Sequence, residues 1–394
     1  MFHLTSFPFR TLRSVCFVLS MLAICCLPGL AQAGASAPAQ TSPASNDPTR
    51  PELQPSLSAD RDPIPSPDPD EPPPSAKAAT PSTAPGKTGE IEKGKNGEYT
   101  LYQDVDEVLL NCAVIDDKGR PVLDLKRDDF RVWEDGVPQA LTGFIHQDAP
   151  VSMGILIDNS GSMRDKRAAV NQAAMELLKD SNPKDAAFVV NFSDRAYLDQ
   201  GFTSNFALLS RALNRFDSQG TTAMYDAVAA SADELSKHSP ETKQVLLIVT
   251  DGADNASRLD LRQAISRVQG LSGPVVYTIG LLYDTSQEEA DRTRQALESM
   301  STETGGIAYF PRSLAEVDSI ASQVAQDIRN QYTVGYHSSR PLSQGGYRAV
   351  RVEARAPKHG RLIVRTKRGY YARRPQANPG SPASTQAENK QPPR

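Results

Sequence analysis

The sequence predicts an α/β domain with a doubly wound, mostly parallel sheet, inserted into a small all-β sandwich. Two observations lead to this prediction. Between residues 151 and 330, short apolar runs alternate with stretches whose apolar residues recur at helical spacing, which is the pattern of a parallel sheet covered by helices on both faces. The flanking segments, 99–150 and 331–374, instead show short strands and tight turns. Because the ends of a domain usually lie close together, the two flanks can form one sandwich around the inserted domain.

Residues 1–33 have the pattern of an export signal. Arg10 and Arg13 precede an apolar stretch from Val15 to Leu27, and small residues lead up to a cleavage position after Ala33. We therefore expect an exported protein, either periplasmic or secreted to the cell surface, with no stable membrane span after cleavage.

Two alternatives to simple cleavage remain open. A retained membrane anchor is disfavoured because the apolar stretch is shorter than the roughly 20 residues that a spanning helix needs. Lipid attachment at Cys25 is the other, since Leu22–Cys25 faintly resembles a bacterial lipobox. After cleavage Cys112 is the only cysteine left, so the sequence predicts no intramolecular disulfide and a packed thiol within an apolar strand.

Two further segments have the composition of disordered chain. Residues 34–98 are rich in proline, serine, alanine and aspartate and contain no aromatic residue, and residues 375–394 are rich in proline, serine and glutamine. Such segments bury too little apolar area to offset the entropy of ordering. We expect a disordered linker and a disordered tail.

The elements of the α/β domain follow from periodicity. Strands are predicted at 153–158, 186–192, 245–250, 275–281 and 307–310, and helices at 170–178, 206–216, 224–235, 259–268, 287–300 and 313–330. In the flanks, strands are predicted at 107–115, 130–133, 140–145, 331–336, 347–356 and 361–371. Asp135-Gly136 between two of these strands is a strong hairpin signal.

Polar residues follow two of the apolar strands at the point where each strand ends. Gly154–Ile157 is followed by Asp158, Ser160 and Ser162, and Val245–Val249 is followed by Thr250 and Asp251. Parallel strands end at the same edge of a sheet, and ligands of open α/β sheets bind in the crevice beyond those ends. A set of carboxylates and hydroxyls suits a hard cation such as Mg²⁺, with Mn²⁺ and Ca²⁺ as alternatives.

Other oxygen-bearing residues lie near this set in the sequence. Thr221 and Thr222 precede a predicted helix and offer a third hydroxyl to the site. Thr221, Asp226 and Asp254 are candidates for hydrogen bonding to the ligands without contacting the cation. For Asp254, shaping its loop is the better interpretation. For Asp226, a solvated or helix-capping role fits equally well. The set leaves room for water or for one ligand from outside.

Taken together, these motifs resemble the von Willebrand factor type A family. Its metal-ion-dependent adhesion site has the pattern Asp-x-Ser-x-Ser, then Thr, then Asp, which Asp158, Ser160, Ser162, Thr222 and Asp251 match. Thr222 is preferred to Thr221 because the family's usual Gly-Gly-Thr-Ala aligns with residues 220–223. The wider layout is similar to bacterial exported proteins described as VWFA-related. The resemblance implies that the cation binds an acidic side chain of a partner protein. Because the family also contains members used purely for assembly, the resemblance is compatible with that role as well.

The function classes can be ordered on this basis. A net charge of −4 and a pI near 5.8 give no sign of a nucleic-acid binder. We expect a non-enzymatic, metal-dependent protein-binding module for adhesion or for assembly of an envelope complex. A metal-assisted hydrolase is one alternative, although no histidine, phosphate loop or nucleophile elbow accompanies the site. A purely structural envelope subunit is the other.

Overall fold

The computed structural model describes residues 63–65, 67, 91–93, 99–101, 107–146, 148–215, 217–270, 272–341 and 344–372. The predicted export signal, the predicted tail and most of the predicted linker lie outside these residues. Within the described part of the chain, no helix is both long enough and apolar enough to cross a bilayer.

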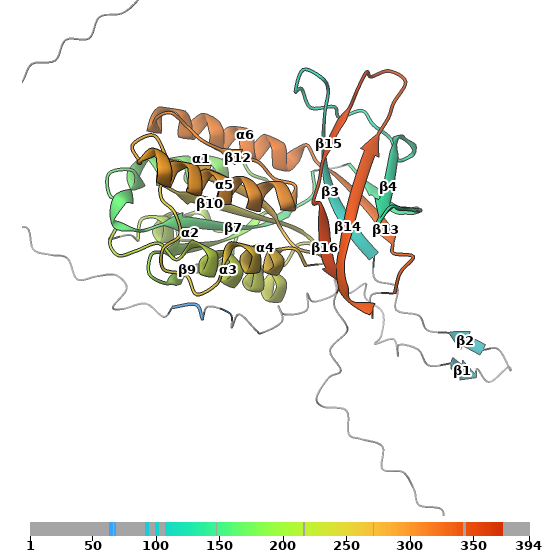
Figure 1. Ribbon diagram of the computed structural model, residues 1–394, viewed down its shortest axis with the longest axis horizontal. Helices are drawn as coiled ribbons and strands as arrows, with labels where there is room; N and C mark the ends of the chain where they lie inside the picture. The colour runs from blue at the N-terminus through green and yellow to red at the C-terminus, as the bar shows by residue number, and fades with distance from the viewer. Residues whose placement is uncertain are drawn as a thin grey trace, which may run out of the picture. The chain divides into compact units, whose positions relative to one another are not determined.

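The centre of the α/β domain is a six-stranded sheet in the order β12-β11-β10-β7-β8-β9 (Figure 1). All neighbours are parallel except β9, which runs antiparallel to β8. The strands are β7 (Val151–Asp158), β8 (Ala186–Phe192), β9 (Ala196–Thr203), β10 (Lys243–Thr250), β11 (Val275–Gly280) and β12 (Ala308–Tyr309). Every residue of β7 and β10 is buried, as expected for central strands covered on both faces.

Six helices cover the two faces of this sheet (Figure 1). Residues of α1, α2 and α6 share a core with one face of β7, and residues of α3, α4 and α5 share a second core with the other face. The helices are α1 (Arg167–Lys179), α2 (Phe206–Leu213), α3 (Met224–His238), α4 (Leu261–Val268), α5 (Gln287–Thr304) and α6 (Val317–Arg329). The carboxyl ends of β7 and β10 therefore open between two helical layers.

The flanking segments form two four-stranded antiparallel sheets around a single core. The sheet orders are β15-β3-β13-β6 and β16-β14-β4-β5. From the first flank come β3 (Glu107–Ile115), β4 (Phe130–Glu134), β5 (Val137–Gln139) and β6 (Leu141–Ile145); from the second come β13 (Tyr332–His337), β14 (Gly346–Ala354), β15 (Ile363–Arg365) and β16 (Gly369–Ala372). Each sheet combines strands from both flanks, so the predicted fold class, an α/β domain inserted into a β-sandwich, is confirmed.

Several local predictions need correction. The single strand predicted at 361–371 is two strands, β15 and β16, which belong to different sheets. Asp135 and Gly136 both have positive φ, as the hairpin signal requires, but the turn joins β4 to β5 and the following β6 crosses to the other sheet. The edge strand β9 was not predicted, because its sequence, Ala196–Thr203, has neither an apolar run nor clean alternation.

Two short pieces of the predicted linker carry backbone pairing. Pro63 forms an antiparallel bridge with Tyr197, and the Ile64 N–H donates a 2.9 Å hydrogen bond to the Ala196 carbonyl, so this piece lies on the outer edge of β9. Strands β1 (Ile91–Lys93) and β2 (Tyr99–Leu101) pair antiparallel with each other.

The thiol of Cys112 is fully buried in the sandwich core. Burial raises its pKa to about 12, which keeps it protonated and unreactive at neutral pH.

Candidate metal centre

The ends of β7 and β10 meet side by side, with Ile157 opposite Val249. The Thr250 hydroxyl donates a 2.6 Å hydrogen bond to Asp158 Oδ2 across the two strands. Asp158 has no exposed surface. Asp158 is buried because it ends β7, whose apolar residues place the whole strand in the interior of the domain.

The loop after β7 folds back so that its hydroxyls approach the end of β10. Asp158 Oδ1 accepts the Ser160 N–H at 2.8 Å, and a single 3₁₀ turn follows at Gly161–Met163. The Ser160 and Ser162 hydroxyl oxygens lie 3.2 Å apart, and the Ser162 hydroxyl donates a 2.7 Å hydrogen bond to Asp251 Oδ1. Four of the five predicted site residues are thus in one hydrogen-bonded cluster. Ser162 is its exposed member, so the cluster opens to solvent there.

Thr222 reaches the same region on a separate loop. The Gly161 N–H contacts the Gly220 carbonyl at 3.4 Å, which lays the loop before α3 against the loop after β7. The Thr222 N–H donates a 2.9 Å hydrogen bond to Asn255 Oδ1. Thr222 is buried whereas Thr221 is exposed.

The two further acidic candidates support loops. Asp254 accepts the Tyr225 N–H at 2.8 Å and the Ser257 hydroxyl at 2.5 Å. Asp226 accepts the Leu259 N–H at 3.0 Å and the Arg258 N–H. Both carboxylates therefore fasten the segment after β10 to the start of α3.

Lys166 is a member of the cluster that sequence reasoning missed. Its Nζ lies 2.7 Å from Asp251 Oδ2 and 2.8 Å from Asp284 Oδ1, and its side chain is only 8% exposed. Asp284 follows β11, the neighbour of β10, but three residues separate it from Gly280 at the strand end, so the rule that identified Asp158 and Asp251 does not identify it. No sequence signal distinguishes Lys166 from a solvated lysine before a helix.

Arg167 was missed as well. It is fully buried beneath the end of β7, where its guanidinium donates to Asn191 Oδ1 at 2.6 Å and reaches the Asp158 carbonyl at 3.5 Å. Arg167 supports the strand end from behind the site.

The charges of the cluster shift its pKa values. Burial, with a smaller contribution from the Asp251 charge, raises the pKa of Asp158 to about 6 against the opposing effect of its hydrogen bonds. Burial lowers the pKa of Lys166, but its hydrogen bonds to Asp251 and Asp284 outweigh burial, so that its pKa is raised overall. Lys166 is therefore a permanent positive charge beside the site.

The residues present fit a hard divalent cation. Among the described residues, no group of three or more His, Cys, Asp or Glu side chains is placed to hold a metal, so a site here would have to depend on hydroxyls. Asp158 and Asp251 supply carboxylates and Ser160, Ser162 and Thr222 supply hydroxyls, an all-oxygen set suited to Mg²⁺, Mn²⁺ or Ca²⁺.

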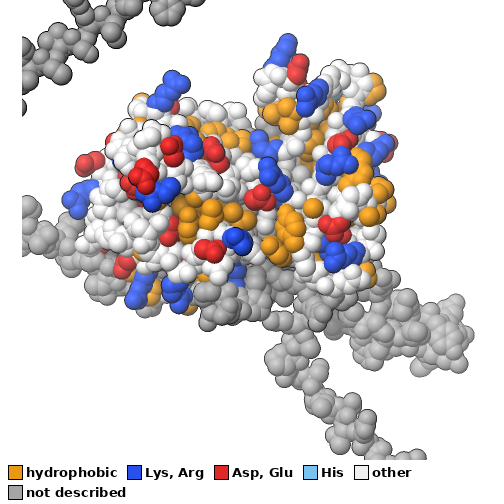
Figure 2. Space-filling view, in the orientation of Figure 1, with side chains coloured by type: hydrophobic (Ala, Val, Ile, Leu, Met, Phe, Trp, Pro, Cys, Tyr) orange, Lys and Arg blue, Asp and Glu red, His pale blue; other side chains and the backbone are white. Residues whose placement is uncertain are grey.

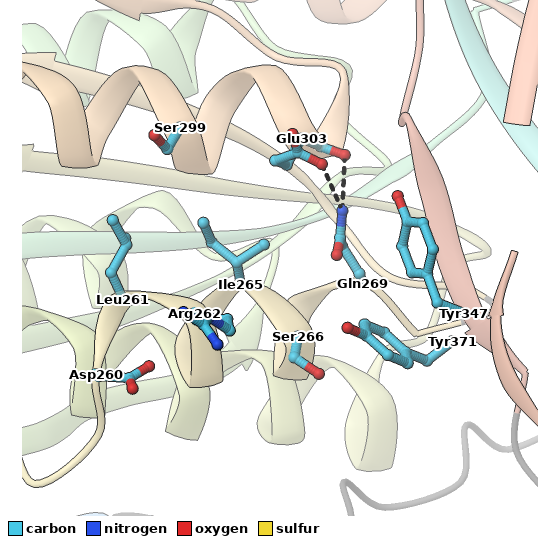
Figure 3. Close-up of a pocket in the computed structure, with 10 residues that line it drawn as sticks. All are labelled: Asp260, Leu261, Arg262, Ile265, Ser266, Gln269, Ser299, Glu303, Tyr347 and Tyr371. Atoms are coloured by element: carbon cyan, nitrogen blue, oxygen red, sulfur yellow. Dashed lines mark hydrogen bonds between the residues drawn. The ribbon is translucent and has the colours of Figure 1, made fainter. Parts of the chain in front are cut away.

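A cavity of about 620 Å³ lies elsewhere in the molecule, and none of the metal-site candidates lines it. Its walls come from α4, α5, β14 and β16. Figure 3 shows Gln269 donating to Glu303 at the centre of the lining, with the rings of Tyr347 and Tyr371 close together at one end. This cavity adjoins the contact between the α/β domain and the sandwich, where the Tyr371 N–H donates to the Gln269 carbonyl at 2.8 Å.

Comparison with known proteins identifies the class of the inserted domain. Residues 153–253 match the family model of the von Willebrand factor type A domain, so the chain carries a domain of this family. The match includes all five predicted metal-site residues. No curated protein sequence matches the chain.

Three solved structures illustrate the similarity. The chain is 15% identical to von Willebrand factor type A from Catenulispora acidiphila, covering 62% of this chain and 73% of that one at a TM-score of 0.41. It is 14% identical to the PilB minor pilin from Streptococcus sanguinis, covering 47% of this chain and 63% of the pilin at a TM-score of 0.38. It is 17% identical to proximal thread matrix protein 1 from the mussel byssus, solved with a zinc-occupied MIDAS motif, covering 50% of each chain at a TM-score of 0.41.

Proposed function

We propose that this protein is an exported, non-enzymatic binding module that holds a divalent cation at the end of its sheet and uses it to capture an acidic side chain of a partner protein. The observation that carries the proposal is the hydrogen-bonded cluster of Asp158, Ser160, Ser162 and Asp251 within a von Willebrand factor type A domain. With Thr222, these residues would hold the cation, and the bound cation would supply a positive charge for a carboxylate to bind.

The open side of the cluster supports a ligand from outside. Ser162 is exposed while Asp158, Ser160 and Asp251 are each no more than 3% exposed. A partner would therefore approach from the Ser162 side. The exposed Tyr283, beside Asp284, offers an aromatic surface at the same rim.

The surrounding chemistry supports a protein partner over a substrate to be hydrolysed. Of the four described histidines, His146, His337 and His359 belong to the sandwich and His238 ends α3, whose first residue follows the site. Among the described residues around the cluster there is thus no histidine that could act as a general base. Acidic and basic side chains are interspersed on the face shown in Figure 2, without the continuous basic surface that nucleic acid would require.

Titration calorimetry of the full-length chain with Mg²⁺ and Mn²⁺ tests the proposal. Binding is expected in the wild type and should disappear in Asp158→Ala and Asp251→Ala. Asp291→Ala, which changes an exposed carboxylate on α5, is the matched control and should bind like the wild type. Wild-type protein that binds neither ion would refute the metal site, and unchanged binding in both site variants would refute the residue assignment.

A test of capture separates adhesion from a purely structural role. If partner proteins are retained by the immobilised chain only when Mg²⁺ is present, and not by Asp251→Ala, the metal takes part in binding. Equal retention with a chelator would assign the site to structure alone. Hydrolysis of generic ester or phosphate substrates that depends on Asp251 would favour the metal-assisted hydrolase instead.

A further inference from the structure

Lys166 is the feature of the cluster that the proposed function leaves unused. The residue directly precedes α1 and extends its ammonium between two carboxylates, 2.7 Å from Asp251 Oδ2 and 2.8 Å from Asp284 Oδ1. The two acceptors differ in environment, because the Asp251 side chain is 1% exposed and the Asp284 side chain is 51% exposed. Lys166 therefore connects the buried end of β10 to the rim where a partner would arrive.

The ammonium changes the charge that a divalent cation would meet. Asp158 and Asp251 alone would offset both charges of the cation. Lys166 already neutralises Asp251, whose other oxygen accepts the Ser162 hydroxyl. Charges a few ångströms apart in a partly buried site interact strongly, so that a fixed positive charge opposes a second cation and attracts an anion.

We propose, on the basis of the function given above, that Lys166 is a specificity-determining residue of the metal site, which weakens binding of the divalent cation and strengthens binding of the partner's carboxylate. The bound cation keeps more of its positive charge because one of its two carboxylates is shared with Lys166. A carboxylate arriving at the Ser162 side meets both the cation and the ammonium. Metal affinity is thereby reduced in favour of affinity for an acidic ligand.

A purely structural role for Lys166 makes a different prediction. Removing one partner of a buried ion pair destabilises a protein and loosens the groups around it. If Lys166 only held Asp251 in place, its loss would weaken metal binding and carboxylate binding together. The proposed role instead requires the two affinities to change in opposite directions.

The first experiment measures Mn²⁺ binding alone, by calorimetry, on the full-length chain. Lys166→Met should bind Mn²⁺ about tenfold more tightly than the wild type, and Lys166→Arg, which keeps the charge, should remain close to the wild type. Lys179→Met is the matched control, because Lys179 is an exposed lysine of α1 that pairs with Glu176. Its affinity for Mn²⁺ should equal that of the wild type.

The second experiment measures binding of acetate, a minimal carboxylate, to the Mn²⁺-loaded protein through paramagnetic broadening of the acetate methyl resonance. Lys166→Met should bind acetate more weakly than the wild type. Asp284→Asn, at a half-exposed position, removes a negative charge beside Lys166 and should have the opposite effect to Lys166→Met. Its Mn²⁺ binding should be weaker, and its acetate binding stronger, than those of the wild type. This variant also tests the charge effect if Lys166→Met fails to fold.

The outcomes distinguish this inference from the proposed function. Equal or weaker Mn²⁺ binding by Lys166→Met, or acetate binding that does not fall, overturns the role of Lys166 while leaving the metal site intact. Mn²⁺ binding by Lys166→Met but not by the wild type supports the role of Lys166 and contradicts the proposed function. Absence of Mn²⁺ binding by both proteins overturns both.

Discussion

The hydroxyl of Ser162, on the loop after β7, donates a 2.7 Å hydrogen bond to the Asp251 carboxylate at the end of β10. The two residues are 89 positions apart in the chain. Their contact joins two further pairs into one cluster. The Ser162 hydroxyl oxygen also lies 3.2 Å from the Ser160 hydroxyl oxygen, and the Asp251 carboxylate also accepts a hydrogen bond from Lys166. Together with the hydrogen bond from Thr250 to Asp158, this contact links the two halves of the candidate metal centre.

Replacing Ser162 with alanine should weaken metal binding much more than it weakens the fold. The variant loses a candidate ligand and the contact that orients Asp251, so Mn²⁺ affinity should fall about tenfold or more. The free energy of unfolding should fall by only about 1 to 2 kcal/mol, because the two hydrogen bonds that are lost, to Asp251 and to Ser160, are only partly buried. Calorimetry and urea unfolding measure the two quantities.

Ser299→Ala is the control for this variant. Ser299 is a half-buried residue of α5 in the lining of the cavity, and its hydroxyl donates a hydrogen bond within the helix, to the Gln295 carbonyl. Its Mn²⁺ affinity should be unchanged. If Ser162→Ala also retained wild-type affinity, Ser162 would not be a ligand.

Glu134 should be among the residues most important for stability of the sandwich. Its buried carboxylate accepts hydrogen bonds from the hydroxyls of Tyr336 and Tyr370, at 2.7 and 2.8 Å, and pairs with the fully buried Arg348. The Ser338 hydroxyl is a further donor, at 2.5 Å; Glu134 belongs to the first flank and all four of these partners to the second. Glu134→Gln leaves the Arg348 charge uncompensated, and the free energy of unfolding should fall by about 3 kcal/mol.

Urea unfolding followed by circular dichroism measures this change. Glu353→Gln is the control, since Glu353 pairs with Arg351 and Arg355 on the exposed side of β14. Loss of such surface pairs should cost less than about 1 kcal/mol. Equal effects of the two variants would contradict the assignment of Glu134 as the central acceptor between the flanks.

Much of the fold and part of the cluster could be predicted because the signals are local. The apolar runs of β7 and β10 end in Asp158 and Thr250, and the rule that parallel strands end at one edge of a sheet places Asp158 and Asp251 together without further information. Helical periodicity likewise located the helices, with differences of a few residues at their ends.

The remaining features depend on contacts between distant residues. Lys166 lies 85 residues from Asp251 and 118 from Asp284, and a lysine in the sequence looks the same whether solvated or paired. Arg167 is fully buried although its residue type is usually exposed. The split of 361–371 into β15 and β16 was also unpredictable, because each half pairs with a different sheet.

Gly154 should tolerate no larger side chain while its neighbours are unchanged. The residue lies in β7 between Phe188 and Leu246, and an added Cβ would lie 2.5 Å from Phe188 Cζ and 2.6 Å from Leu246 Cδ2. Gly154→Ala should lower the free energy of unfolding by about 1 to 3 kcal/mol through overpacking. Thermal and urea unfolding measure the loss.

A second substitution tests the cause. Phe188→Leu removes the ring atoms that the new methyl group would meet, so the double variant should lose less stability than the sum of the two single variants. Simple additivity would mean that Gly154→Ala acts through the backbone and not through the contact with Phe188.

Lys367 should make the stability of the protein depend on pH in the alkaline range. Its side chain is almost completely buried between β15 and β16, and burial lowers its pKa to about 8, whereas an unfolded lysine titrates near 10.4. Between these two values the unfolded chain binds one proton more than the folded chain. The free energy of unfolding should therefore rise with pH across this window, by about 3 kcal/mol in total, and the gain should be absent below pH 8.

Comparison of the wild type with Lys367→Met isolates this effect. Burial also lowers the pKa of Lys243 to about 8, so both proteins should share the rise due to Lys243 and differ by the part due to Lys367. Urea unfolding at intervals from pH 7 to 10.5 gives the two curves. Lys358→Met, at an exposed position in the sandwich, should follow the wild type. If Lys367→Met showed the same rise as the wild type, the lysine would remain charged in the folded protein throughout this range, and its burial would have to be compensated by a bound anion or a nearby carboxylate.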